Sequence, residues 1–268
     1  MRFALVDSGL GLLPAAAELC KLCSGAQFVL SMDPDGLPWG ARSPGDIAAR
    51  ALACARATLR CDPDVLVFAC NTASVQALGV LRTELEATVP VVGTVPAIKP
   101  AVSVREPVAV WATAATTGSA YQRDLIERVA EGVPVAEVAC PGLAEAIEAA
   151  DEQQIEAAVA RAAAHTPPQS GAIVLGCTHY ELAAEVIHTA TPYARVHGSA
   201  AAVAAQALRR ARENGASATS DRHSVRVLCS GRPSGLPAAA SRYPEGRLLA
   251  RHASAGAHTP AHSSPPNG

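Results

Sequence analysis

The chain has 268 residues and a formal net charge of -2 at pH 7, and 49% of its residues are hydrophobic against 17% charged. Such a length predicts one large domain or two small ones with a substantial core. The balanced charge argues against a nucleic acid or an anionic membrane as partner. No apolar run approaches the roughly 20 residues of a transmembrane helix, so we expect a soluble protein.

The first residues have the outline of a signal peptide, because Met1 and Arg2 precede a short apolar stretch and a run of alanines. Asp7, Ser8 and Gly9 interrupt that apolar stretch, so we expect the chain to stay in the cytoplasm. Its eight cysteines are too dilute for a disulfide scaffold. Most of them are therefore expected to be reduced, and the question becomes which thiols do chemistry.

Short apolar runs that end in Gly, Ser, Asp or Cys alternate with longer stretches rich in Ala, Leu, Glu and Arg. This alternation is typical of strands followed by helices and predicts a parallel α/β fold. Strands are predicted at 3–6, 27–30, 65–69, 91–93, 108–112, 135–138, 173–176 and 195–197, with one more at 225–228. Helices are predicted at 45–59, 75–87, 143–164 with a break near Ala150, 181–189 and 200–214.

The end of the chain has a different composition. After Arg251 it is almost entirely Ala, Ser, Pro, Gly, His and Thr, without apolar periodicity. We therefore predict a disordered tail over residues 252–268, in which His252, His258 and His262 are solvated rather than metal ligands. No cluster with zinc-type spacing occurs in the sequence, and we expect no metal.

Two segments in different halves of the chain have the same pattern. Residues 65–72 read VLVFACNT and residues 172–179 read AIVLGCTH, so each is an apolar strand that ends in a cysteine, Cys70 or Cys177. At the carboxyl ends of parallel strands the next helix presents its N-terminal amides, a position that suits reactive groups and lowers the pKa of a thiol. Two such units predict two similar halves that face each other across a cleft.

Cys70 and Cys177 in these matching positions suggest an acid and a base on opposite sides of one substrate carbon. Such a pair removes a proton from one face and delivers another to the opposite face, which is a racemisation. The alternative is that both are small buried residues that finish their strands. The residues beside them carry groups that suit an amino acid better than a core, namely Asn71, Thr72, Thr178 and His179.

A racemase that uses pyridoxal phosphate would need a lysine for the Schiff base and a phosphate-binding loop. The only lysines are Lys21 and Lys99, and no glycine-rich phosphate loop lies beside either of them. We therefore expect a reaction without a cofactor.

Six segments, in this order, resemble the cofactor-independent aspartate/glutamate racemase family. They are DSGLG at 7–11, PWG at 38–40, ACNTAS at 69–74, residues 113–121, Cys140-Pro141 with Glu148, and GCTHY at 176–180. The resemblance covers the chain from Arg2 to about Leu249. Trp39 departs from the tyrosine that the family usually has at that position.

The resemblance implies an α/β fold of two similar parallel-sheet domains related by pseudo-twofold symmetry, with the active site in the cleft between them. The first domain would comprise residues 1–94 and 207–251, and the second residues 95–206. Family members differ in oligomeric state, and a homodimer is one state that the resemblance allows.

The resemblance also implies roles for individual residues. Cys70 is expected to deprotonate the D-isomer and Cys177 the L-isomer. Asp7 would lie beside the first cysteine, and His179 and Glu148 would assist the second. The residues expected to contact the amino acid are Asp7, Ser8, Pro38, Trp39, Gly40, Asn71, Thr72, Thr116 and Thr178.

The implied activity is the cofactor-independent interconversion of L- and D-glutamate, an isomerase reaction that supplies D-glutamate for peptidoglycan in a bacterial cytoplasm. A small amino acid is then the expected partner, with no nucleic acid and no membrane. Two alternatives stay open: a racemase of the same family for aspartate or another amino acid, and a non-catalytic amino-acid-binding protein on this fold.

Overall fold

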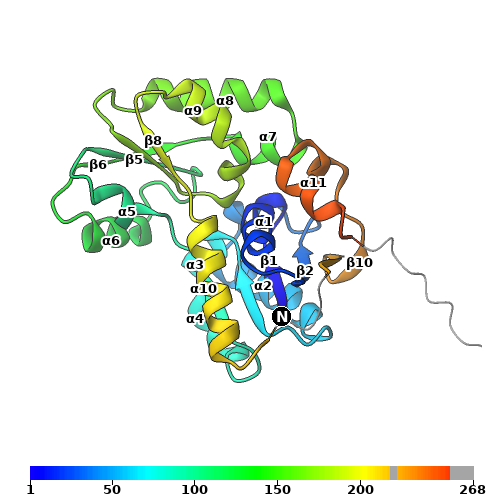
Figure 1. Ribbon diagram of the computed structural model, residues 1–268. Coiled ribbons are helices and arrows are strands. Elements are labelled where there is room, and N and C mark those ends of the chain that lie inside the picture. Colours follow the sequence, from blue (N-terminus) through cyan, green and yellow to red (C-terminus); the bar gives the residue numbers. More distant parts are fainter. Residues whose placement is uncertain (218–221, 254–268) are drawn as a thin grey trace, which may run out of the picture.

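The computed structural model describes residues 1–217 and 222–253, and in it the chain forms two β-sheets, each flanked by helices (Figure 1). The larger sheet has six strands in the order β10-β9-β2-β1-β3-β4, and the smaller has four in the order β6-β5-β7-β8. The strands of the larger sheet are β1 (Arg2–Val6), β2 (Gln27–Met32), β3 (Val65–Phe68), β4 (Val91–Gly93), β9 (Ser224–Cys229) and β10 (Arg232–Ser234). Those of the smaller sheet are β5 (Val108–Ala112), β6 (Val135–Ala139), β7 (Ala172–Leu175) and β8 (Arg195–His197).

The predicted parallel α/β class is confirmed, because every strand pair is parallel except β9 with β10. Each predicted strand is present with ends close to the predicted ones, and only β10 was not predicted. The tail predicted to be disordered lies outside the described residues, apart from His252 and Ala253.

Four strands of each sheet follow one another in the same order. In the larger sheet this order is β2-β1-β3-β4, and in the smaller sheet it is β6-β5-β7-β8, so in both the second strand along the chain lies beside the first, then the third and the fourth. Cys70 directly follows the Ala69 that succeeds β3, and Cys177 follows the Gly176 that succeeds β7. The two cysteines thus stand after corresponding strands. The pseudo-twofold axis itself stays a prediction, as do the domain bounds 1–94 with 207–251 and 95–206.

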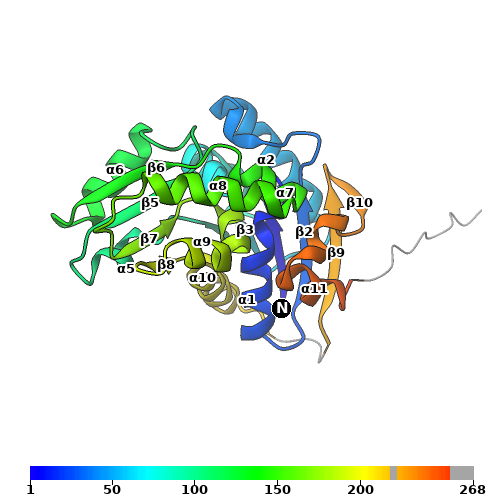
Figure 2. The same ribbon diagram turned by 90° about the horizontal axis from the view of Figure 1, so that it is seen from above.

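Helices cover both faces of the larger sheet (Figure 2). On one face lie α2 (Pro44–Leu59), α3 (Asn71–Gln76) and α4 (Leu78–Leu85), and on the other α1 (Leu13–Leu22), α10 (Ala200–Glu213) and α11 (Pro244–Ala250). Side chains alternate along a strand, so Ala4 and Val6 of β1 pack toward α2, whereas Phe3 and Leu5 pack toward α1. All four side chains are fully buried.

The smaller sheet is covered in the same way. On one face lie α5 (Ile98–Val102) and α6 (Ala120–Val129), and on the other α7 (Leu143–Ala149), α8 (Glu152–His165) and α9 (Ala184–Ala190). Along β5, Val108 and Val110 face α5, whereas Ala109 and Trp111 belong to the opposite core. That opposite core is continuous with the one beneath α1 of the larger sheet, so apolar packing joins the two halves.

The helices differ from prediction where backbone conformation overrides the high propensity of an alanine-rich chain. The single helix predicted at 75–87 begins earlier and is divided at Ala77, whose φ of -131° is not helical. The break predicted near Ala150 is confirmed, because Ala150 has a φ of +53° and the Asp151 side chain then caps α8. The helix predicted at 181–189 begins as a 3-10 turn over Thr178–Ala183.

The short 3-10 segment Ala238–Arg242 and α11 extend from the larger sheet to the helices of the smaller one (Figure 2). The Tyr243 hydroxyl donates a 2.5 Å hydrogen bond to the carbonyl of Ile147 in α7, and Arg242 forms an ion pair with Glu152 of α8. The C-terminal elements thus bind the two halves together. Within the described residues, no helix is both long enough and apolar enough to span a membrane.

Candidate active site

A cavity of about 260 Å³ lies at the carboxyl ends of strands from both sheets. Segments that follow β1, β2 and β3 of the larger sheet and β5, β6 and β7 of the smaller one form its wall. This is the edge at which parallel α/β sheets bind ligands. The predicted site residues that line the cavity are Ser8, Pro38, Trp39, Gly40, Cys70, Asn71, Thr72, Thr116, Glu148, Cys177, Thr178 and His179.

Asp7 is the one predicted site residue behind the wall, because it is fully buried. The backbone N–H of Ser8 donates to its Oδ1 at 2.6 Å, and the Thr178 hydroxyl donates to its Oδ2 at 3.0 Å. The Cys70 thiol is a further hydrogen-bond partner of this carboxylate. Asp7 thus connects the first cysteine with a residue from the opposite half of the molecule.

Burial sets the protonation of this first pair. Desolvation raises the pKa of Asp7 to about 6, although the positive charge of His179 and the hydrogen bonds oppose the rise. The pKa of the Cys70 thiol is raised well above its ordinary value, first by burial and then by the charge of Asp7. At neutral pH the pair therefore consists of a thiol that can give up a proton and a carboxylate that can accept one.

The second cysteine has a different partner. Sγ of Cys177 lies 3.9 Å from Nδ1 of His179, and Nε2 of the same ring lies 2.9 Å from Oε2 of Glu148. Burial lowers the pKa of His179, but the hydrogen bonds with Cys177 and Glu148 outweigh it and raise that pKa well above its ordinary value. The ring is therefore an imidazolium at neutral pH, held between a sulfur and a carboxylate.

Two glycines allow the first strand to approach these partners closely. A Cβ on Gly9 would lie 2.3 Å from Oε2 of Glu148, and one on Gly11 would lie 2.4 Å from Oγ1 of Thr178. Any side chain at either position would displace these polar groups. The DSGLG segment therefore has a steric reason for its glycines, and the backbone N–H of Leu10 can donate to Glu148 at 2.8 Å.

Asn71 lines the cavity and has one buried acceptor without a partner in the described part of the chain. Its Nδ2 donates to the carbonyl of Gly176 at 2.7 Å, which joins the segments after β3 and β7. Its Oδ1 is buried and has no hydrogen-bond partner among the described residues. An unpaired buried oxygen is costly unless a ligand satisfies it, so this atom points to an occupant that carries an N–H or O–H donor.

Several lining residues were not predicted: Leu37, Ala41, Thr113, Ala114, Ala115, Cys140, Pro141, Gly142, Ala144, Glu145 and Gly176. Two of them carried a usable signal, because Thr113 and Cys140 directly follow β5 and β6, at the edge where the site was expected. Glu145 lies three residues before Glu148 on α7, which places both on one helix face. Ala114, Ala115, Pro141 and Gly176 lie within the segments that resemble the family, whereas nothing in the sequence singled out Leu37, Ala41 or Ala144.

Neither Lys21 nor Lys99 lines the cavity, so no lysine is placed there to form a Schiff base. Of the residues that the structure describes, no group of three or more His, Cys, Asp or Glu side chains could hold a metal ion. The titratable groups that line the cavity are the thiols of Cys70, Cys140 and Cys177, the imidazole of His179 and the carboxylates of Glu145 and Glu148, with Asp7 behind the wall.

Comparison with known proteins agrees with this geometry. Residues 13–207 match the family model for Asp/Glu/Hydantoin racemases. The chain is 42% identical to a glutamate racemase of Roseiflexus over 183 residues, which is 66% of this chain and 67% of that protein. It is 35% identical to a glutamate racemase of Methylococcus capsulatus over 222 residues, or 78% of this chain and 79% of that one.

Solved structures give the same result. The glutamate racemase of Escherichia coli, in complex with L-glutamate and an activator, has a TM-score of 0.78 and 27% identity, and the match covers 94% of each chain. That of Aquifex pyrophilus has a TM-score of 0.63 and 27% identity, covering 88% of this chain and 97% of that one. The chain therefore belongs to the Asp/Glu/Hydantoin racemase family, and its relatives there are glutamate racemases, which are isomerases.

Proposed function

We propose that the chain interconverts L- and D-glutamate by proton transfer between two cysteines and the substrate, without a cofactor. One observation carries this proposal: Cys70 and Cys177 line the same cavity from different sheets, each with its own acid–base partner. A single buried cysteine would not need a partner of this kind, and two that only packed a core would not face one cavity.

In the L-to-D direction, the Cys177 thiolate removes the α-proton, so that the Cα–H bond breaks and an S–H bond forms. The electron pair left on Cα delocalises into the α-carboxylate. The Cys70 thiol then delivers its proton to the opposite face of Cα and becomes a thiolate. The L-to-D turnover leaves Cys70 as a thiolate and Cys177 as a thiol, which is the starting state for the D-isomer, and the reverse direction uses the same steps in reverse. From the resting state this pair of states is reached when Asp7 accepts the Cys70 proton and the imidazolium of His179 gives a proton to Cys177.

The protonation states on the page suit these roles. Cys70 rests as a thiol because its pKa is raised, which makes it the proton donor for the L-isomer. The imidazolium of His179 stabilises negative charge on the sulfur of Cys177 beside it. A buried site that excludes water strengthens both interactions and helps a modest base to remove a weakly acidic proton.

Substrate binding would rely on neutral groups, because no lysine or arginine lines the cavity. The unpaired Oδ1 of Asn71 is suited to accept from the substrate ammonium group. The hydroxyls of Thr72 and Thr116 are suited to donate to the carboxylates, whereas those of Ser8 and Thr178 already donate to Asp7. Pro38, Trp39 and Gly40 would complete the site as a wall against the substrate.

The product D-glutamate would supply peptidoglycan synthesis. Because the relatives are bacterial enzymes, we propose a bacterial cytoplasm as the location of the chain. A homodimer stays a prediction from the family resemblance. An aspartate racemase and a silent amino-acid-binding protein are the alternatives that the test must separate.

The test is turnover of single enantiomers by the purified chain without any added cofactor. L-Glutamate, D-glutamate and both aspartates are incubated separately, and optical activity is followed by circular dichroism. Racemisation of glutamate, lost in Cys70→Ser and in Cys177→Ser, is the expected result. Turnover of aspartate alone would change the substrate and leave the mechanism, whereas no turnover of either acid would contradict the proposal and favour the binding protein.

A further inference from the structure

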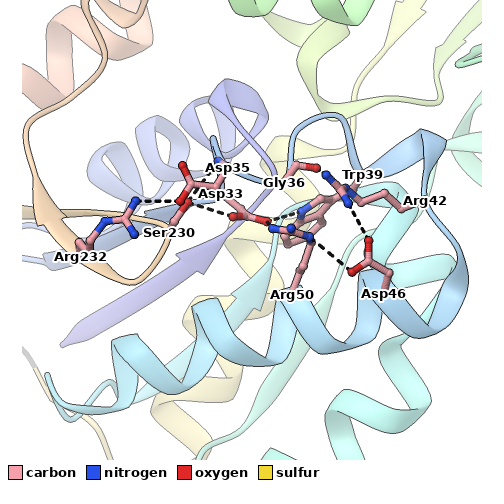
Figure 3. A network of polar contacts seen from close by, with 9 residues as sticks. All are labelled: Asp33, Asp35, Gly36, Trp39, Arg42, Asp46, Arg50, Ser230 and Arg232. Atoms are coloured by element: carbon pink, nitrogen blue, oxygen red, sulfur yellow. Dashed lines mark hydrogen bonds and ion pairs between the residues drawn. The ribbon is translucent and has the colours of Figure 1, made fainter.

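The loop between β2 and α2 forms one wall of the cavity, through Leu37, Pro38, Trp39, Gly40 and Ala41. No regular strand or helix longer than the 3-10 turn Trp39–Ala41 stabilises this loop. Its position must therefore come from side-chain contacts, and these converge on one residue, Asp33 (Figure 3).

Asp33 is buried at the end of β2 and receives hydrogen bonds from three directions. Its Oδ2 accepts from Nε1 of Trp39 at 2.9 Å and from Nη1 of Arg50 on α2 at 3.0 Å. Its Oδ1 accepts from the hydroxyl of Ser230, between β9 and β10, at 3.0 Å. One carboxylate thus ties the cavity wall to a helix and to a hairpin (Figure 3).

The backbone of Asp33 extends the connection to the site itself. Its N–H donates to the carbonyl of Ser8 at 3.1 Å, and its carbonyl accepts from the N–H of Gly36 at 2.9 Å. A Cβ on Gly36 would lie 2.0 Å from Oδ2 of Asp33 and 2.4 Å from Nη1 of Arg50. The loop is therefore folded tightly around this carboxylate, and only glycine fits at its tip.

We propose that Asp33 is a positioning residue for substrate binding, because it holds the indole of Trp39 and through it the wall formed by Pro38 and Gly40. Trp39 is only 1% exposed although it lines the cavity, and its indole N–H is paired with Asp33. This inference rests on the proposed racemase function, since it names the residue that fixes a wall of that site.

The positioning role of Asp33 predicts a particular kinetic change. Pro38, Trp39 and Gly40 carry no group that takes part in the proposed proton transfers. Loosening this wall should therefore weaken binding of ground state and transition state alike, which raises KM and leaves kcat nearly unchanged. A hydrogen bond to a charged group predicts a rise of about tenfold in KM for Asp33→Ala. Trp39→Phe removes the N–H donor together with part of the ring and should raise KM by about threefold.

The double variant Asp33→Ala/Trp39→Phe tests whether the two residues act through one contact. If they do, its KM should be close to that of Asp33→Ala alone, because the indole contact is already lost. Arg232→Ala is the matched control. Arg232 pairs with Asp35 in the same network, but both side chains are mostly exposed, at 70% and 57%, so its KM should equal that of the wild type.

A second readout does not depend on activity. The chain has two tryptophans, so in a Trp111→Phe background the fluorescence reports Trp39 alone. Acrylamide should quench that fluorescence weakly, and severalfold more strongly once Asp33→Ala is added. Asp33→Asn retains one acceptor and should restore most of the protection, as well as most of the substrate affinity.

The results separate this inference from the proposed function. A lower melting temperature in Asp33→Ala with unchanged KM and unchanged quenching would overturn the inference, because Asp33 would then serve stability only. A wild-type chain that does not racemise glutamate would overturn the function and the KM claim with it. The quenching comparison would still decide whether Asp33 holds Trp39.

Discussion

Thr178 donates a 3.0 Å hydrogen bond from its hydroxyl to Oδ2 of Asp7, although the two residues lie on segments that follow strands of different sheets. The acceptor is fully buried and is also a hydrogen-bond partner of Cys70. Thr178 directly follows Cys177 in the chain. The segment that carries the second cysteine thus influences the partner of the first.

Loss of this hydroxyl should shift the acid side of the pH–rate profile. A hydrogen bond to the ionised carboxylate lowers the pKa of Asp7, so Thr178→Val should raise that pKa further above 6, by roughly one unit. The acid limb of the profile of kcat/KM against pH should move to higher pH by the same number of pH units. Thr178→Ser keeps the donor and should keep the wild-type profile, and equal profiles for the two variants would contradict the link.

The buried carboxylate of Asp7 should make stability depend on pH. Its pKa is raised from 3.8 to about 6 in the folded chain, so its contribution to stability is fully present below the unfolded value and is lost as the pH rises through about 6. Asparagine does not ionise, so Asp7→Asn should not lose this stability as the pH rises. The free energy of unfolding of the variant relative to wild type should therefore increase by roughly 2 kcal/mol between pH 4 and pH 7.

Urea denaturation at several pH values measures this difference. Parallel curves of unfolding free energy against pH for Asp7→Asn and wild type would show that the carboxylate titrates alike in the folded and unfolded chain. In that case Asp7 could not be poised to exchange a proton with Cys70 near neutral pH.

The carboxylate of Glu148 should keep His179 charged. Its hydrogen bond to Nε2 at 2.9 Å raises the pKa of the ring, so Glu148→Gln should lower that pKa and reduce the imidazolium fraction at neutral pH. In the proposed mechanism the charged ring stabilises negative charge on the sulfur of Cys177 during proton abstraction, so kcat/KM should fall by about tenfold. NMR titration of labelled imidazole rings measures the pKa directly, with His179→Asn used to assign the resonance.

An unchanged titration of His179 in Glu148→Gln would contradict the role of the carboxylate. A lowered pKa with unchanged kcat/KM would instead contradict the role of the charged ring in stabilising the thiolate. The two measurements therefore test separate steps of the same argument.

Asn71 should matter for both stability and binding. Its Nδ2 joins the two halves through Gly176, and its Oδ1 is buried without a partner within the described residues and is proposed to accept from substrate. Asn71→Ala leaves the carbonyl of Gly176 without this partner and should cost about 1 to 3 kcal/mol of unfolding free energy. KM for glutamate should also rise. A loss of stability with unchanged KM would show that Oδ1 does not bind substrate.

Much of this fold follows from local patterns. Buried strands such as those that contain Leu5, Val67 and Val174 are continuous apolar runs, which is what a parallel sheet covered on both faces requires. The repeated strand–cysteine pattern also placed Cys70 and Cys177 at one edge of their sheets. Helix ends were less predictable: the break near Ala150 was predicted, but the one at Ala77 was not, because an alanine there carries no signal for its non-helical φ of -131°.

The cross-sheet contacts of the site could not be read from local patterns. Nothing in the sequence near Asp7 indicates that Thr178 would donate to it, since that contact depends on how the two halves pack. The same holds for Asp33, whose partners Arg50 and Ser230 come from a helix and a hairpin. Family motifs named many of the residues that line the cavity, whereas residues such as Asp33 that hold them in place became visible only in three dimensions.

The central claim is that two different thiols act on opposite faces of one carbon, and isotope distribution in D2O tests it most directly. Unlabelled L-glutamate is incubated briefly, and the L- and D-glutamate pools are separated and examined by NMR at Cα. A thiol holds a single proton, so two bases predict deuterium in nearly all of the new D-glutamate and almost none in the remaining L-glutamate. Deuterium that entered the L-pool as fast as D-glutamate formed would instead indicate one base serving both faces.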